Sequence, residues 1–245
     1  MEIGKWKSEI EDEDKSVMSG RVVEISVESV ERAIAAERGG ASRIELCGAL
    51  EIGGVTPSVE LMRETRARVR VPIFSMVRPR GGDFVYSAAE FEEMRKSTEV
   101  ARAERMDGVV LGLLRSDGRV DVERTAELVR AAAPLAVTFH RAIDESAELF
   151  EALEDVIAAG AVRLLTSGGA GTAPEAVVRI AELVKRARGR IVVMPGSGVT
   201  AENVAKMARA TGATEFHAGL SSVVARAAGA AEFEREVRRL VGALD

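Results

Sequence analysis

Eight short apolar runs alternate with segments of helical spacing along most of the chain. These runs are rich in Val, Ile and Leu and fall at 21–27, 42–47, 71–77, 107–111, 135–140, 162–166, 190–194 and 214–218. Alternation of this kind predicts βα units and a parallel sheet. Eight units within residues 20–245 favour a single-domain α/β fold, a closed (β/α)₈ TIM barrel. An open doubly wound sheet is the alternative, weakened because no run is followed at once by a complete Gly-x-Gly-x-x-Gly turn.

Helix start and stop signals lie between the runs. The first helix is expected to close at Gly39-Gly40, and the second to open at Thr56-Pro57 with Thr56 as its N-cap. Capping-box patterns stand at Ser87–Glu90 and Thr172–Glu175. A last helix is predicted over about residues 222–243, with no strand after it.

The composition narrows the class of protein. The 245 residues are 47% hydrophobic and 30% charged. A chain of that length buries a stable core without disulfides or structural metals. Its net charge of −5 is spread without a basic patch, and no run approaches the roughly 18 apolar residues of a membrane span. With Cys47 as the single cysteine, we expect a cytoplasmic protein that binds neither nucleic acid nor membrane. Residues 1–19 are acidic and aperiodic, which predicts a disordered or mobile N-terminal extension.

Rare side chains fall at the carboxyl ends of the runs. His140 ends the fifth run, His217 lies near the end of the eighth, and Cys47 ends the second. Because these ends form the active-site mouth of a barrel, both histidines and the cysteine are expected at one rim. A structural reading stays open for each: Cys47 as a small buried hydrophobe and His217 as a hydrogen-bonded core residue.

Two acids, Glu24 and Glu45, interrupt apolar strands. Acids seldom occupy such positions unpaired, and Arg78 or Arg141 are candidate partners. Near the mouth these carboxyl groups suit acid–base work, a neutral imidazole moves protons, and a guanidinium binds carboxylate or phosphate. The catalytic candidates are therefore Glu24, Glu45, His140 and Arg141.

Glycine-rich loops follow the last three runs, and a charged loop, 78–87, follows the third. Glycine lets backbone N–H groups approach an anion, and barrels often bind phosphate after strands seven and eight. Barrel turns also use glycine without any ligand. The loop 78–87 suits a substrate-facing lid. The predicted substrate- or anion-binding residues are Arg78, Arg80, Asp83, Ser167, Gly168, Gly169, Gly196, Ser197, Gly198 and Gly219.

Several segments together resemble the CutC family of copper-homeostasis proteins. They are "GGASRIELCGALEIGGVTPS", "SMVRPRGGDFVYS", "VTFHRAID", "LLTSGG" and "EFHAG", in order over residues 21 to about 222. The resemblance implies a TIM barrel, a cytoplasmic location, copper homeostasis with copper binding, and a homo-oligomer, either a dimer or a tetramer. For copper it suggests the ligand set Cys47, His140 and His217.

The chain departs from that family at Ser26, where members often carry a cysteine. Cu(I) prefers soft sulfur ligands, and only Cys47 is left to supply a thiolate. Met76 and Met194 offer thioethers, although core packing is their commoner role. Two functions stay open: a copper-binding homeostasis protein, and a barrel enzyme acting on a small anionic or phosphorylated metabolite by acid–base chemistry. A scaffold for partners is a third alternative, which the polar rim disfavours.

Overall fold

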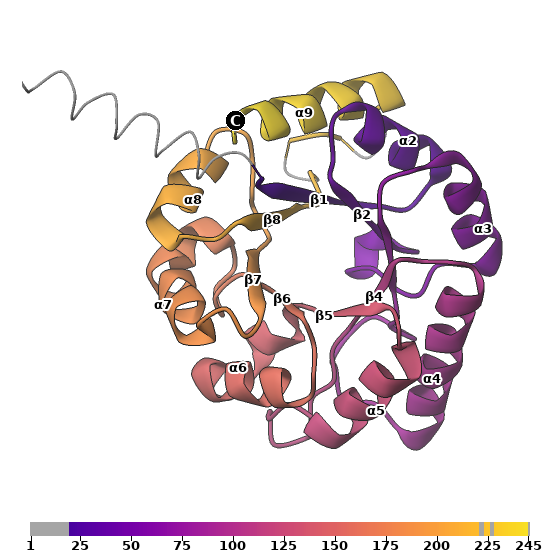
Figure 1. Cartoon of the computed structure of the whole chain (residues 1–245), viewed down its shortest axis with the longest axis vertical. Helices are drawn as coiled ribbons and strands as arrows, with labels where there is room; N and C mark the ends of the chain where they lie inside the picture. The colour runs from indigo at the N-terminus through magenta and orange to yellow at the C-terminus, as the bar shows by residue number, and fades with distance from the viewer. Residues whose placement is uncertain (1–19, 221–222, 226–227, 245) are drawn as a thin grey trace, which may run out of the picture.

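The computed structural model of the chain describes residues 20–220, 223–225 and 228–244; the predicted N-terminal extension, 1–19, lies outside them. Its strands are β1 (Val22–Val27), β2 (Arg43–Leu46), β3 (Ile73–Met76), β4 (Gly108–Leu111), β5 (Ala136–Phe139), β6 (Arg163–Thr166), β7 (Val192–Pro195) and β8 (Glu215–Ala218). Every hydrogen-bonded neighbour pair is parallel, in the order β7-β6-β5-β4-β3-β2-β1-β8. β7 and β8, the two ends of that order, lie side by side and complete the ring (Figure 1). The predicted TIM barrel is confirmed.

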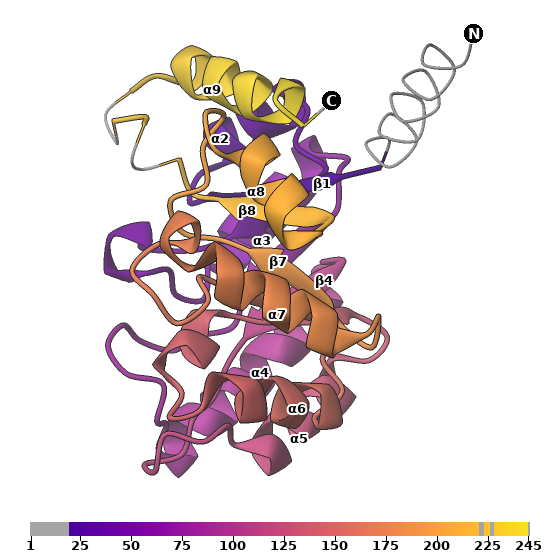
Figure 2. The ribbon, with the colours of Figure 1, turned by 90° about the vertical axis from the view of Figure 1, so that its left-hand side faces the viewer.

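Helices surround this ring (Figure 1). They are α2 (Val30–Arg38), α3 (Val59–Arg68), α4 (Ala88–Ala103), α5 (Val122–Ala132), α6 (Leu149–Ala158), α7 (Val177–Ala187), α8 (Val204–Thr211) and α9 (Ala230–Gly242). Short 3₁₀ turns, η1 (Leu50–Ile52), η2 (Arg141–Glu145) and η3 (Ala173–Ala176), follow β2, β5 and β6. α9 packs against α2, as both views show (Figures 1 and 2). Within the described ranges, no helix has the length and apolar character needed to cross a membrane.

The helix signals are confirmed at three positions and wrong at two. α2 ends with Gly39 as its C-cap, and both capping boxes are present, Ser87–Glu90 opening α4 and Thr172–Glu175 opening η3. α3, however, begins at Val59 with Ser58 as N-cap, not at Thr56-Pro57.

Thr56 does not cap the helix, because its hydroxyl is hydrogen-bonded to the backbone of Arg78, after β3. Its hydroxyl accepts from the Arg78 N–H at 2.9 Å and donates to the Arg78 carbonyl at 3.1 Å. The last helix also starts later than predicted, at Ala230. Gly229 before it is extended, with ψ of 160°, and Val224 packs into the core from a turn.

The interior of the ring carries charges where barrels of this kind mostly hold branched aliphatic side chains. Arg43 and Arg163 both contact the Glu215 carboxylate, each at 2.6 Å, and both guanidinium groups lie over the Phe74 ring, at 5.0 and 5.3 Å. Arg43 also pairs with Glu24. These side chains form a layer of ion pairs beneath the carboxyl ends of the strands.

The contact between α2 and α9 leaves no room for a side chain at Gly39. A Cβ built there would lie 2.6 Å from Val237 Cβ. We expect Gly39→Ala to lower the free energy of unfolding by about 1–3 kcal/mol in urea denaturation, because overpacking forces α9 outward. Gly242→Ala is the control, since a Cβ there meets nothing within 4 Å; its stability should stay equal or rise by up to about 1 kcal/mol. Equal stability of the two variants would contradict a tight α2–α9 contact.

Candidate functional site

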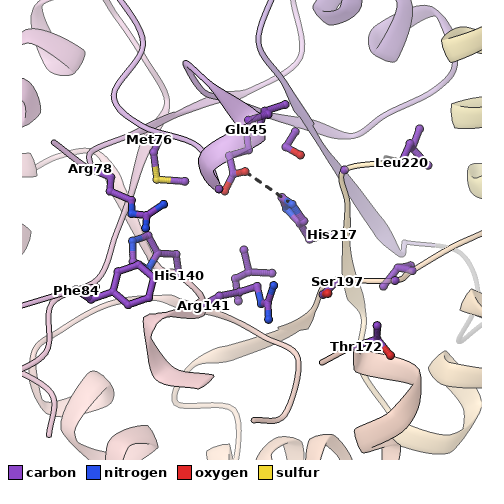
Figure 3. A pocket seen from close by; sticks show the side chains of 17 residues that line it. Glu45, Met76, Arg78, Phe84, His140, Arg141, Thr172, Ser197, His217 and Leu220 are labelled. Atoms are coloured by element: carbon purple, nitrogen blue, oxygen red, sulfur yellow. Dashed lines mark ion pairs between the residues drawn. The ribbon is translucent and has the colours of Figure 1, made fainter. Parts of the chain in front are cut away.

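A pocket of about 420 Å³ opens at the carboxyl ends of the strands (Figure 3). The predicted site residues that line it are Glu45, Arg78, His140, Arg141, Ser197, Gly198, His217 and Gly219. Figure 3 shows Glu45 and His217 on one side, with Arg78 and His140 on another. The expectation that both histidines lie at one mouth is met by this pocket, whereas Cys47 is buried and does not line it.

Other predicted residues lie outside the pocket lining. Arg80 pairs with Asp83 at 2.9 Å and with Glu90 at 2.6 Å on the outer part of the 78–87 loop. Within the loop after β6, the N–H groups of Ser167 and Gly169 donate to the Asp144 carboxylate at 2.9 and 3.0 Å. Glu24, Gly168 and Gly196 also lie outside the lining. An anion-binding role for these loop residues stays a prediction.

Strand register brings a buried acid–histidine–acid group together. Glu24 on β1 is in register with Arg43 on β2 and with His217 on β8. The Nδ1 atom of His217 lies 2.9 Å from Glu24 Oε1, while Glu24 Oε2 accepts from Arg43. The other nitrogen of the same imidazole, His217 Nε2, lies 3.7 Å from Glu45 Oε2; this is the dashed pair in Figure 3. The imidazole is therefore held between two carboxylates.

These neighbours set the proton affinities of the group. Burial tends to raise the pKa of Glu24, but the His217 hydrogen bond and the Arg43 charge outweigh it and lower that pKa to about 2. Burial tends to lower the pKa of His217, yet the Glu45 charge and the Glu24 contacts raise it. Burial, with help from the Glu24 charge, raises the pKa of Glu45 despite His217. Glu45 and His217 are thus poised to exchange a proton with a bound molecule.

Cys47 is a protonated thiol in this environment. Burial and then the Glu45 charge raise its pKa well above the usual value, and its Sγ donates to Glu45 Oε2 at 3.5 Å. Among the described residues, one group of three metal-ligating side chains has all its ligand atoms within 4.8 Å of one another: Glu24, Glu45 and His217. The predicted set Cys47, His140 and His217 does not form such a group. Copper binding stays a prediction.

His140 differs in its surroundings from His217. It follows β5, and its Nδ1 accepts from the Ala142 N–H at 3.2 Å, so in the neutral ring we assign the proton to Nε2. The ring lies 4.9 Å from that of Phe84. Burial, followed by the charges of Arg78 and Arg141, lowers its pKa to about 3. His140 is therefore neutral at physiological pH and offers an N–H donor.

Arg78 is a buried cation bound by carbonyl groups. Its guanidinium donates to the carbonyls of Ile52 at 3.3 Å, Gly54 at 3.2 Å and Gly82 at 2.7 Å, and lies over the Phe84 ring. Within the described part of the chain it forms no ion pair, and its Nε has no hydrogen-bond partner. Arg141, by contrast, pairs with Asp144 at 2.9 Å.

Sequence reasoning missed the partners of the two acids. Glu24 pairs with Arg43 and His217, not with the expected Arg78 or Arg141. The signal was present, since Arg43 precedes Glu45 by two residues and so shares its face of the strand. Phe84, which contacts both His140 and Arg78, lies in the 78–87 loop that was predicted to face a substrate, but it was not singled out there.

The ion pairs of Glu24 make stability depend on pH. Its pKa in the folded chain, about 2, lies below the ordinary 4.5, so its contribution is present above pH 4.5 and is lost as pH falls toward 2. We expect Glu24→Gln to lower the free energy of unfolding at pH 7 by about 3 kcal/mol, with a deficit that narrows on acidification. Urea denaturation between pH 7 and pH 3 measures this.

The control for that variant is Glu151→Gln. The Glu151 side chain is 64% exposed, 3.6 Å from Arg119, and its loss should change stability by less than about 1 kcal/mol. A Glu24→Gln deficit no larger than the control, or one that does not narrow on acidification, would contradict the assigned ion pairs.

Comparison with known proteins gives one consistent family. A model of the CutC family matches residues 21–222. A protein named CutC from Chromobacterium violaceum is 51% identical over 207 residues, 84% of each chain, and the copper homeostasis protein cutC homolog of Mus musculus is 46% identical over 204 residues, 83% of this chain and 75% of that one.

Solved structures agree in fold. The crystal structure of a copper homeostasis protein CutC from Streptococcus agalactiae matches with a TM-score of 0.76 and 31% identity, over 81% of this chain and 98% of that one. Thiamine phosphate pyrophosphorylase from Pyrococcus furiosus matches at a TM-score of 0.59 and 17% identity, over 92% and 96% of the two chains. The second likeness shows the barrel fold alone.

Proposed function

The chain belongs to the CutC family of copper homeostasis, and on that premise we propose that the mouth of its barrel binds a small anionic metabolite and performs acid–base chemistry on it. One observation carries the proposal: Arg78 is 5% exposed, yet within the described residues its guanidinium donates to backbone carbonyls and has no carboxylate partner. A buried charge without a counter-ion is costly, and an anion in the pocket would offset that cost.

The far wall of the pocket suits the same ligand. Ser197 and Gly198 line it with φ of +74° each, and their backbone N–H groups have no acceptor in the described part of the chain. Two features favour glycine at position 198: its positive φ, and the Cβ of any other residue, which would lie 3.0 Å from Thr172 Cβ. Consecutive free N–H groups in such a turn favour anionic oxygen.

Glu45 and His217 supply the acid–base pair. Glu45 Oε2 faces His217, while Glu45 Oε1 is buried and has no partner among the described residues. That oxygen is free to accept a proton from a ligand, and His217 beside it supports the resulting change in charge. Arg78 would then hold the anion while Glu45 acts on it.

Anion binding should depend on Arg78. We expect inorganic phosphate or pyruvate to raise the Tm of the intact protein by several degrees, because about 2.7 kcal/mol is gained at a hundredfold excess over Kd. Arg78→Gln should lose this shift. Arg63→Gln, which changes a 64% exposed arginine on α3 outside the pocket lining, should keep it. No shift with either anion, or an equal shift in Arg78→Gln, would remove the proposal.

Copper binding is the second candidate, favoured by two sulfur atoms. Cys47 and Met76 belong to one buried cluster with Phe74 and Val110, and Met76 also lines the pocket. A thiolate and a thioether are the soft ligands that Cu(I) prefers, and His217 or Glu45 would complete the set. The fit is partial, because Cys47 must first lose a proton that its surroundings hold firmly.

An anaerobic Cu(I) titration against a competing chelator separates the two candidates. If copper is the cargo, binding is one-to-one, collapses in Cys47→Ser, and strengthens as pH rises because the thiol must deprotonate. Met94→Leu, in α4 and away from the pocket lining, serves as the control. Weak binding, or binding indifferent to Cys47, would exclude copper as a ligand of this mouth.

Family membership also supports two proposals on the state of the molecule. We propose a cytoplasmic homo-oligomer, either a dimer or a tetramer. Sedimentation velocity should give a mass at least twice the 26.1 kDa of the chain, and a single species at the mass of one chain would contradict it.

A further inference from the structure

We propose that the bound metabolite carries a carbonyl group, that His140 donates a hydrogen bond to the carbonyl oxygen, and that Glu45 removes a proton from the neighbouring carbon. This inference rests on the proposed function, which supplies the anion site and the acid–base pair. It adds the class of substrate, the reaction and a role for the second histidine.

Two unpartnered buried atoms carry the argument. Glu45 Oε1 and His140 Nε2 have no hydrogen-bond partner within the described ranges, and each residue is only 4% exposed. Both residues line the same pocket, from β2 and from the end of β5 (Figure 3). A buried polar atom left unpaired destabilises the folded chain, so this pair is best explained by a ligand that satisfies both atoms.

His140 is built as a donor. Its Nδ1 is occupied by the Ala142 N–H, which leaves the proton on Nε2. The ring packs against Phe84 and against Gly112, just after β4, where a Cβ would lie 2.4 Å from Nδ1. A fixed neutral imidazole of this kind polarises a carbonyl oxygen, as in known enzymes that form enolates.

A hydrogen bond is the means of carbonyl activation that this pocket offers. Schiff-base chemistry needs an amine, and no lysine lines the pocket. In the described part of the chain the lysines are Lys96, Lys185 and Lys206, all exposed on outer helices. Glu45 as acceptor and His140 as donor therefore demand a substrate with an acidic C–H beside a C=O group.

The proposed step balances without an added oxidant or reductant. Glu45 Oε1 takes the proton, the electron pair of the C–H bond becomes the new C=C bond, and the former π pair moves onto oxygen. The resulting negative charge is stabilised by the His140 N–H. Return of the proton to the same carbon exchanges hydrogen with solvent. In a hydroxy aldehyde or ketone, the proton can instead return to the former carbonyl carbon; the neighbouring hydroxyl group then gives its proton to the charged oxygen and becomes the new carbonyl, which isomerises the substrate. With Arg78 holding the anionic end, the class is small 2-keto acids and phosphorylated hydroxy aldehydes or ketones.

Proton exchange in D₂O, followed by ¹H NMR, tests the step with two probes. Pyruvate presents a carboxylate beside the carbonyl, and glycolaldehyde phosphate presents a phosphate ester. We expect the intact protein to accelerate deuterium uptake beside the carbonyl of at least one probe. Glu45→Gln should lose that activity, and His140→Phe, which keeps a flat ring, should lose about 10²–10³-fold. His140→Gln restores an N–H donor and should recover part of the loss, whereas Glu151→Gln should exchange like the intact protein.

The Arg78-dependent Tm shift with phosphate is the separate readout. Retention of that shift in Glu45→Gln and His140→Phe shows that both variants fold and bind. With the shift retained, no exchange of either probe by the intact protein, or undiminished exchange in His140→Phe, would overturn the inference and leave anion binding in place. Loss of Arg78-dependent binding in the intact protein would instead remove the proposed function itself.

Discussion

The ion pairs inside the barrel depend on the buried carboxylate of Glu24. It is fully buried, and each oxygen contacts a different side chain, Oε1 the His217 ring and Oε2 the Arg43 guanidinium. Arg43 continues to Glu215, and Glu215 to Arg163. Charges of alternating sign thus join β1, β2, β6 and β8. No member can leave without exposing its neighbours as unpaired buried charges, which makes the arrangement cooperative.

This network also decides how the two histidines behave. His217 stands between carboxylates that favour its protonated form, whereas His140 stands near Arg78 and Arg141, which favour its neutral form. The pocket has an acidic side and a cationic side, so a polar ligand that enters it has one favourable orientation.

The sequence was sufficient for the architecture because the barrel repeats one local pattern eight times. Apolar runs, capping boxes and the glycine after α2 are each specified by a few adjacent residues. The pairing of Glu24 with His217 was beyond it, because that depends on how β1 and β8, far apart in the chain, are staggered. Thr56 shows the same limit at small scale: its sequence suits an N-cap, but its hydroxyl is hydrogen-bonded to Arg78, 22 residues away.

The ring is joined unevenly. Seven neighbouring strand pairs are connected by ladders, while β7 and β8 meet as the ends of the hydrogen-bonded order. No strand ladder joins β7 to β8 in the described part of the chain, and the Arg163–Glu215 ion pair, from β6 to β8, spans this seam. The Ser197–Gly198 turn follows β7, whereas Glu45 lies on β2, across ladders that stay closed. The anion-facing turn therefore stands beside the seam between β7 and β8, whereas Glu45 stands on a strand joined by ladders to both of its neighbours.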